Sequence, residues 1–134
     1  MTKEIIIDAS VAADFVISVS KRREFMACEF FDGTHDFHAP TLIDFEVTSA
    51  IRKLLLARRV SEDEAFMALE EHLKAPILRH AAAPLLTRAL RLRENISAYD
   101  ASYVVLAQAF EGLLITRDAR LARVAERHCA VVVV

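Results

Sequence analysis

The chain has 134 residues, of which 54% are hydrophobic and 27% are charged, and its formal net charge is −2 at pH 7. This length suits a single domain, residues 1–134, and two glycines and three prolines leave little room for linkers. The slightly negative charge argues against a protein that holds nucleic acid by bulk charge alone. We find neither a secretory leader nor an apolar run of roughly 18 residues, so we expect a cytoplasmic protein without membrane contact.

Short apolar runs alternate with longer helical patterns along the chain. Strands are predicted at residues 4–8, 36–39, 77–80, 112–116 and 130–134. Helices are predicted at residues 10–19, 21–32, 41–57, 61–74, 83–95, 98–110 and 118–127. Strands separated by helical crossovers imply a parallel sheet with helices on both faces. We therefore expect an α/β fold in three layers, with about five parallel strands in the central sheet.

Several residues mark the predicted boundaries of these elements. Pro40 ends the second strand, and Thr41 can cap the helix that follows it. Ser61 begins a capping box with an acidic first turn, which the helix dipole favours. Gly112 is expected to end the sixth helix and to start the fourth strand. These signals agree with the alternation of strands and helices.

Four acidic residues lie where an α/β sheet is expected to bind a ligand. Asp8 directly follows the isoleucine run at residues 5–7, which is typical of a strand buried on both faces. Open α/β sheets bind ligands at the carboxyl ends of their strands. Asp100 and Asp118 lie near helix starts, and Glu46 falls on the apolar side of its helix, where a carboxylate needs a partner or a metal. We therefore predict that these four acids share one site.

Each acid also has an ordinary structural explanation. Asp8 and Asp118 can be N-caps, and Ser10 is an alternative cap for the first helix. Asp100 lies three residues after a serine, which is the spacing of a capping box. Asp44 competes for the role of the acid on the third helix, and periodicity alone leaves that choice open. The hypothesis of a shared site therefore depends on the joint placement of the acids.

The clustering of acids favours a divalent cation. Carboxylates within ~5 Å of one another repel, and a hard cation such as Mg²⁺ or Mn²⁺ relieves the repulsion and prefers oxygen ligands. Zn²⁺ fits poorly because the histidines are scattered, at positions His35, His38, His72, His80 and His128. Arg117 and Arg120 flank Asp118, where they can bind a phosphate of a nucleic acid strand. The residues thus predict a divalent-metal nuclease.

Four segments of the chain together resemble PIN-domain proteins. They are residues 6–10, 39–47, 97–107 and 114–122, in the order and spacing of that family. The most specific parts are Tyr99–Tyr103 and Thr116–Leu121. The compact length is similar to that of the VapC-type toxins of bacterial toxin–antitoxin pairs. The resemblance covers essentially the whole chain and implies a PIN-like α/β/α domain.

The resemblance also implies a function and a set of roles. It implies a Mg²⁺- or Mn²⁺-dependent endoribonuclease that cleaves RNA with metal-activated water and is inhibited by a cognate antitoxin. The family's four acids carry over onto Asp8, Glu46, Asp100 and Asp118. By this resemblance, Asp8, Asp100 and Asp118 are metal ligands, Glu46 is a ligand or orients the water, and Asp44 is not used. Thr116 and Ser10 are expected to support the site.

Two other classes of function remain as alternatives. A non-catalytic PIN-fold module that binds RNA or protein would be marked by the loss of one of the four acids, and none is missing. A phosphohydrolase or receiver-like domain would need a second acid beside Asp8, where Ala9 and Ser10 follow instead.

The helical segments carry more apolar surface than one core can cover. Leu54, Leu55 and Leu56 are consecutive and cannot all face the same core, and Leu85 and Leu86 add to the excess. Exposed apolar patches usually mark interfaces. We therefore expect a homodimer and a groove for an antitoxin segment.

Overall fold

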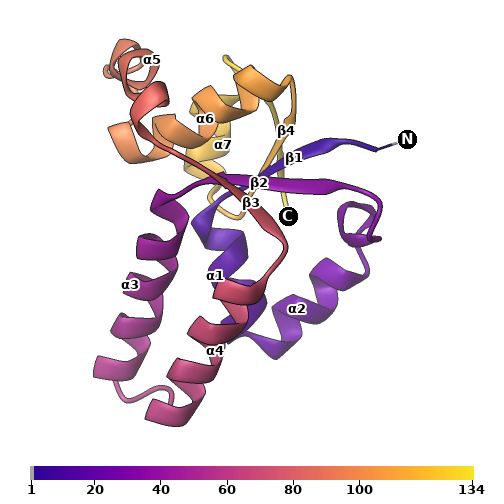
Figure 1. Cartoon of the computed structure of the whole chain (residues 1–134), viewed down its shortest axis with the longest axis vertical. Coiled ribbons are helices and arrows are strands. Elements are labelled where there is room, and N and C mark those ends of the chain that lie inside the picture. The colour runs from indigo at the N-terminus through magenta and orange to yellow at the C-terminus, as the bar shows by residue number, and fades with distance from the viewer. Residues whose placement is uncertain (1) are drawn as a thin grey trace.

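A computed structural model describes residues 2–134 and shows an α/β fold (Figure 1). The strands are β1 (Glu4–Ile7), β2 (Asp36–Pro40), β3 (Ile77–His80), β4 (Leu113–Thr116) and β5 (Ala130–Val133). The helices are α1 (Ala9–Ile17), α2 (Val19–Met26), α3 (Leu42–Leu56), α4 (Glu62–Lys74), α5 (Leu86–Arg91), α6 (Ala98–Phe110) and α7 (Ala119–Ala125). Two 3₁₀ turns, η1 (Glu29–Phe31) and η2 (Ala83–Leu85), precede β2 and α5. None of the helices in this part of the chain is long and apolar enough to cross a bilayer.

The described strands form one parallel sheet in the order β3-β2-β1-β4-β5. The chain moves outward from β1 to β3 and then returns to β4 on the other side of β1. Because such crossovers are right-handed, the reversal places α1–α4 on one face of the sheet and α5–α7 on the other, as Figure 1 shows. The predicted three-layer α/β/α fold is confirmed. The carboxyl ends of β1 and β4 form the switch point at which sheets of this kind bind ligands.

Burial explains the sequences of the central elements. Ile5 and Ile6 of β1 and Leu114 and Ile115 of β4 are completely buried, because helices cover both faces of the sheet. Helix α6 is buried without interruption from Ala101 to Ala107. A helix surrounded in this way is expected to be largely apolar on every side, and its two buried hydroxyl side chains, Ser102 and Tyr103, are both hydrogen-bonded. These elements form the rigid centre on which the site is built.

Two predicted helix boundaries are wrong in detail. Thr41 has helical dihedral angles and its side chain makes no capping hydrogen bond to the described residues, because a capping side chain reaches the first amides from an extended backbone. Helix α6 ends through Glu111, which has a left-handed φ of 50°. Position 112 needs a glycine for a different reason: the backbone of β1 passes so close that a Cβ at this position would lie 2.6 Å from the carbonyl oxygen of Glu4. The capping box of Ser61 is confirmed.

Two predicted helices are shorter than expected. The pattern at residues 21–32 divides into α2, which begins after the N-cap Ser18, and the turn η1, which follows the extended backbone of Cys28. The pattern at residues 83–95 begins as the 3₁₀ turn η2, so that only its middle is α-helical. The apolar residues on both sides of each break face the core, so the apolar pattern continues across the break and does not reveal it.

Candidate active site

The four predicted acids meet at the carboxyl end of the sheet. One cavity of about 160 Å³ is lined by Asp8, Glu46, Asp100 and Asp118, together with Ser10 and Tyr103. Asp8 follows β1, Asp118 follows β4, and the other two acids come from the starts of α3 and α6. The cavity therefore lies at the switch point of the sheet. Within residues 2–134, no three Asp, Glu, His or Cys side chains are grouped closely enough to hold an ion by direct contacts alone.

Asp8 acts as a helix cap and also faces the cavity. Its Oδ1 accepts the backbone N–H of Val11 (3.2 Å) and the hydroxyl of Ser10 (2.6 Å), which makes Asp8 the N-cap of α1. Its Oδ2 accepts the hydroxyl of Thr116 on β4. Ser10 is therefore not the cap of α1, since it lies inside this helix and donates a hydrogen bond to Asp8, which is the cap. Capping fixes the carboxylate in the orientation in which it lines the cavity.

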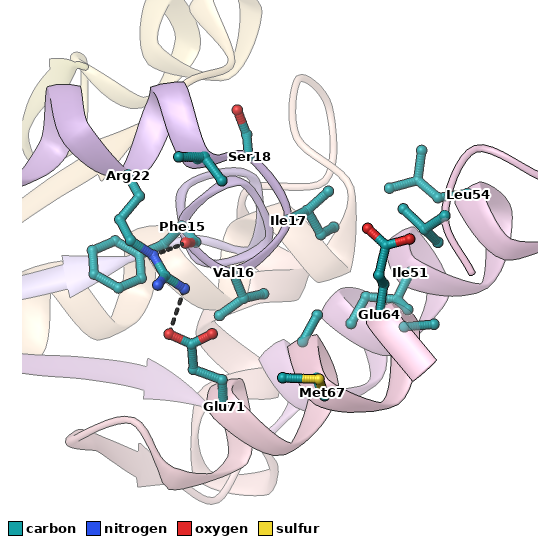
Figure 2. Close-up of a pocket in the computed structure, with 14 residues that line it drawn as sticks. Phe15, Val16, Ile17, Ser18, Arg22, Ile51, Leu54, Glu64, Met67 and Glu71 are labelled. Atoms are coloured by element: carbon teal, nitrogen blue, oxygen red, sulfur yellow. Dashed lines mark hydrogen bonds and ion pairs between the residues drawn. The ribbon is translucent and has the colours of Figure 1, made fainter. Parts of the chain in front are cut away.

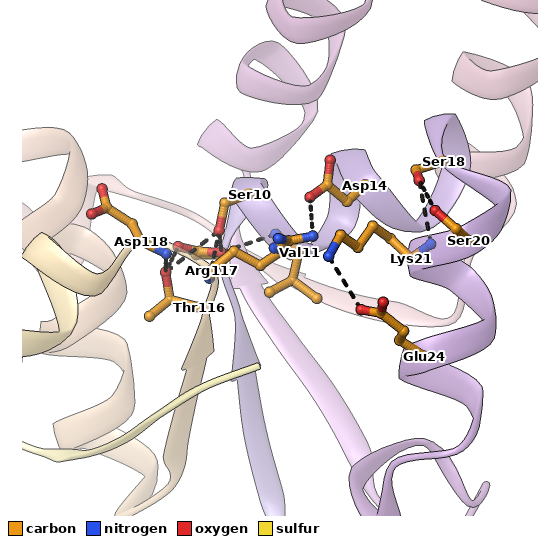
Figure 3. A network of polar contacts seen from close by, with 11 residues as sticks. Ser10, Val11, Asp14, Ser18, Ser20, Lys21, Glu24, Thr116, Arg117 and Asp118 are labelled. Carbon is orange, nitrogen blue, oxygen red and sulfur yellow. Dashed lines mark hydrogen bonds and ion pairs between the residues drawn. The ribbon is translucent and has the colours of Figure 1, made fainter.

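Two hydroxyl groups join the carboxyl ends of β1 and β4 (Figure 3). Thr116 is fully buried, donates to Asp8 and accepts the backbone N–H of Asp118 at 3.0 Å. Ser10 donates to Asp8 and accepts the backbone N–H of Arg117 at 2.9 Å. The loop after β4 is thus bound to the start of α1. These contacts fix the position of Asp118 relative to Asp8.

Asp118 and Asp100 lie at helix starts but use their carboxylates differently. Asp118 Oδ1 accepts the backbone N–H groups of Arg120 and Leu121 at 2.9 and 3.1 Å, so Asp118 caps α7. Helix α6 is capped by Ser97, whose Oγ accepts the N–H of Asp100 at 3.2 Å. No return bond from the Asp100 carboxylate to Ser97 forms in the described structure. The alternative capping box is only half formed, which leaves the Asp100 carboxylate to the cavity.

Glu46 is held by a tyrosine that the sequence predictions did not include. Tyr103 Oη donates to Glu46 Oε1 at 2.7 Å. Tyr103 is almost completely buried, and burial together with the adjacent Glu46 carboxylate raises the pKa of its hydroxyl, so it remains a proton donor. Its position three residues after Asp100 places both side chains on one side of α6. That spacing, in a largely apolar helix, is the sequence signal that could have identified it.

Burial and mutual repulsion raise the pKa of three of the acids. At Asp8 burial is the largest cause and repulsion from Asp100 adds to it, while hydrogen bonds oppose both. Burial likewise raises the pKa of Glu46, with smaller contributions from Asp100 and Asp8. At Asp100 burial and repulsion from Asp118 raise the pKa, and Arg120 lowers it. Because these carboxylates repel one another, a cation placed among them would stabilise their ionised forms.

Asp44 is engaged in a separate ion network. Arg79 Nε donates to both carboxylate oxygens of Asp44 at 3.0 Å, and His72 Nε2 lies 2.8 Å from Oδ1. These contacts join α3 to β3 and α4. Burial lowers the pKa of His72, whereas its bond to Asp44 opposes that shift. Of the two candidate acids on α3, Glu46 is therefore the one that lines the cavity.

The two arginines that flank Asp118 differ in their availability. Arg117 Nη1 pairs with Asp14 Oδ2 on α1 at 2.8 Å, a partner that the sequence did not indicate (Figure 3). Arg120 is exposed and lines, with Asp100, a second cavity of about 330 Å³ beside the acids. The Arg120 guanidinium is therefore better placed than that of Arg117 to contact a phosphate at the acidic rim.

The sequence and the fold match known proteins along almost the whole chain. The PIN domain profile matches residues 5–127. Ribonuclease VapC9 of Mycobacterium tuberculosis (strain ATCC 25618 / H37Rv) is 33% identical over 130 residues, which cover 97% of this chain and 98% of that protein. The chain therefore belongs to the PIN-domain family. Within this family, the chain is similar to VapC9 along almost its full length, which places the chain among the VapC-type ribonucleases.

Solved structures share the same fold. PAE2754 from Pyrobaculum aerophilum superposes with a TM-score of 0.68 at 21% identity, covering 98% of this chain and 92% of that chain. A second structure, VapBC2 from Rickettsia felis bound to a DNA fragment from its promoter, superposes with a TM-score of 0.67 at 10% identity. The match covers 97% of this chain and 98% of that chain. At these identities the likeness concerns the fold alone.

Proposed function

We propose that this chain is a Mg²⁺- or Mn²⁺-dependent endoribonuclease and the toxin of a type II toxin–antitoxin pair, acting in the cytoplasm. The observation that carries the proposal is the convergence of four carboxylates on one cavity at the switch point of the sheet. The similarity to VapC9, a ribonuclease by name, supports RNA as the substrate. A non-catalytic module gains no support, because all four acids line the cavity.

The chemistry of the cavity suits a small divalent cation. Asp8, Asp100 and Asp118 offer only oxygen ligands. The pKa values of Asp8 and Asp100 are raised, which means that their ionised forms are destabilised when no cation is bound. Mg²⁺ usually retains several water ligands, so a few carboxylates suffice to hold it. We therefore assign these three acids as the residues that hold the cation, directly or through water.

The surrounding residues define how the reaction would proceed. A bound divalent cation would supply positive charge for the phosphodiester and lower the pKa of water. Tyr103 occupies Oε1 of Glu46, which leaves Oε2 to orient an attacking water and accept its proton. Thr116 and Ser10 hold Asp8 in a fixed orientation. Attack by the water oxygen breaks one phosphorus–oxygen bond and leaves one phosphate end and one hydroxyl end.

Substrate contacts in this proposal come from the rim of the site. The cavity beside Asp100 is lined by the exposed Arg120, whose charge suits a phosphate of the RNA strand. Arg117 is proposed as a secondary contact, since a phosphate would have to compete with Asp14 for its guanidinium. Contacts of this kind position a strand without reading its sequence.

A groove on the α1–α4 side fits the proposed antitoxin. This groove, called the Phe15 groove, has a volume of about 260 Å³ and is lined by residues of α1, α2, α3 and α4 that include Phe15, Val16, Ile51, Val19 and Met67 (Figure 2). Arg22 closes one side by pairing with Glu71 and donating to the Phe15 carbonyl at 2.7 Å. An apolar floor with charged edges suits an amphipathic peptide segment. Helices α1 and α3 line this groove and also lead to Asp8 and Glu46, so a segment bound here could continue along them toward the acidic cavity.

Exposed leucines support the proposed homodimer. Leu86 and Leu90 are exposed one turn apart on α5, and Leu56 is exposed at the end of α3. Leu85 is buried and Leu54 is half-buried, so the apolar excess is smaller than the sequence suggested. Light scattering of the isolated chain tests the dimer, and replacement of Leu86 and Leu90 by glutamate should give a monomer. A strictly monomeric chain would remove this part of the proposal.

Cleavage of RNA by purified variants tests the proposed function. Asp8→Asn, Asp100→Asn and Asp118→Asn should each abolish Mg²⁺-dependent cleavage of a labelled RNA, while Glu46→Gln should slow it strongly. Asp44→Asn is the matched control, because Asp44 lies on the same helix but outside the cavity. Unchanged cleavage by the three asparagine variants, or equal loss at Asp44 and Glu46, would contradict the assignment.

A further inference from the structure

Two aromatic side chains are exposed beside the acidic cavity. Phe45 is 76% exposed and Tyr99 is 64% exposed. Each directly precedes an acid of the site, since Phe45 adjoins Glu46 on α3 and Tyr99 adjoins Asp100 on α6. Single exposed apolar side chains are ordinary on protein surfaces. What distinguishes this pair is that elements far apart in the sequence bring both to the same place.

Phe45 and Tyr99 line one groove, called the Phe45 groove, that adjoins the acidic cavity. The groove has a volume of about 750 Å³, which lies within the roughly 300–1,000 Å³ typical of sites for small organic ligands. Its walls come from α1, α3 and Tyr99, and the exposed Lys53 lies among its lining residues. Glu46 lines both the groove and the acidic cavity, so the two adjoin at this residue.

We propose that Phe45 and Tyr99 form a stacking platform for one unpaired nucleobase of the RNA, beside the phosphate that is cleaved. The inference rests on the proposed function and deepens it, because it assigns two residues outside the acidic cavity to contact with a base of the substrate. A base inside an A-form duplex keeps both faces covered by its neighbours. An unpaired nucleotide, by contrast, can place its face against an exposed aromatic ring.

The charges on the two sides of the acidic cavity favour a nucleotide over an apolar protein segment, and Asp14, an acid that also lines the Phe45 groove, is already paired with Arg117. The acidic cavity shares Glu46 with the Phe45 groove and Asp100 with the cavity of Arg120. The acids therefore lie between an aromatic surface and a cationic one. A strand laid across them would stack a base on the aromatic side and place a phosphate near Arg120 on the other. Lys53 offers a further positive charge to the backbone on the aromatic side.

Single-turnover cleavage of a short labelled RNA tests the platform. Alanine substitution of a stacking residue typically weakens an interaction with a base by about 5- to 150-fold, which corresponds to about 1–3 kcal/mol. We expect Phe45→Leu and Tyr99→Leu to lower kcat/KM within or just below this range, because leucine keeps the apolar area but removes the ring. Tyr99→Phe should retain the wild-type rate. Phe66→Leu is the matched control, since Phe66 is 62% exposed on α4 and does not line the groove.

A second substrate distinguishes stacking from a general structural effect. An RNA that lacks one base beside the cleavage site should be cut more slowly by the wild-type chain, and it should cause no additional loss in Phe45→Leu or Tyr99→Leu. Such non-additivity is expected when the ring and the base interact, and it is absent when they act independently. Thermal melting should be unchanged in all these variants, because the replaced side chains are exposed.

The possible failures can be told apart. The platform is overturned, and the proposed function stays intact, if the wild-type chain cleaves RNA but Phe45→Leu and Tyr99→Leu have the same kcat/KM as Phe66→Leu and still lose rate when the base is missing. Normal cleavage with a reduced mass in light scattering would show that Phe45 and Tyr99 form a contact between copies of the chain, which also overturns the platform. Absence of any RNA cleavage by the wild-type chain would refute the proposed function and the platform together.

Discussion

Replacing Thr116 with valine removes one hydroxyl group from the centre of the site and preserves the shape of the side chain. That hydroxyl donates to Asp8 Oδ2 and accepts the N–H of Asp118, so the change releases two acids at once. A hydrogen bond to a charged group contributes about 1.5–3 kcal/mol, and an unpaired buried amide costs about 1–3 kcal/mol. The added methyl group offsets part of this loss. We expect the free energy of unfolding to fall by about 2 kcal/mol.

The same substitution should weaken the site for the cation. Removal of groups that orient metal ligands typically costs about 10–100-fold in metal affinity or activity. We therefore expect Thr116→Val to need more Mg²⁺ for half-maximal RNA cleavage, by a factor in this range, and Thr116→Ser to behave like the wild type. Thr48→Val is the control, because its hydroxyl donates to the Asp44 carbonyl at an exposed position on α3. If Thr116→Val and Thr48→Val show the same Mg²⁺ dependence, the role assigned to Thr116 is wrong.

Three further outcomes are expected. Burial and Asp118 raise the pKa of Asp100 above its ordinary value of 3.8, so without metal the folded chain binds this proton more tightly than the unfolded chain does. The stability of the fold therefore falls as pH rises through the raised pKa. Asp100→Asn should raise the melting temperature in EDTA near neutral pH, and this advantage should disappear in acid. Asp44→Asn should keep RNA cleavage but lower the free energy of unfolding by about 1–3 kcal/mol, since the half-buried Arg79 loses its charged partner. Wild-type stability in chemical denaturation would count against that network. Tyr103→Phe should reduce the cleavage rate by roughly tenfold while folding normally, because Glu46 loses its only described hydrogen bond; an unchanged pH–rate profile and rate would exclude the proposed positioning of Glu46.

The layers of the fold could be predicted because they depend on patterns that the sequence carries directly. The isoleucine run of β1 and the apolar length of α6 report burial on all sides, and the alternation of strands and helices implies a parallel sheet. Ser61 was identified as a cap because both halves of its box are local. The prediction that Thr41 caps α3 was wrong, since whether a threonine caps depends on a backbone angle that the sequence does not report.

The acids could be placed in the sequence but their partners could not. A carboxylate at the end of a buried strand is visible in the chain, whereas the bond between Tyr103 and Glu46 joins residues 57 positions apart. The pairing of Arg117 with Asp14 spans 103 positions, and it changes the availability of an arginine that spacing alone made a phosphate ligand. Long-range contacts of this kind follow from the topology of the sheet rather than from local patterns.

The origin of the new phosphate oxygen in cleaved RNA tests the central claim most directly. RNA should be cut by the purified chain in Mg²⁺ and oxygen-18 water, and the fragment ends analysed by mass spectrometry. If acids at the switch point activate water, each new phosphate end is linear and carries one solvent oxygen from the first turnover. A cyclic phosphate without solvent oxygen would show that the RNA's own 2′-hydroxyl is the nucleophile, and it would contradict the role given to Asp8, Glu46, Asp100 and Asp118.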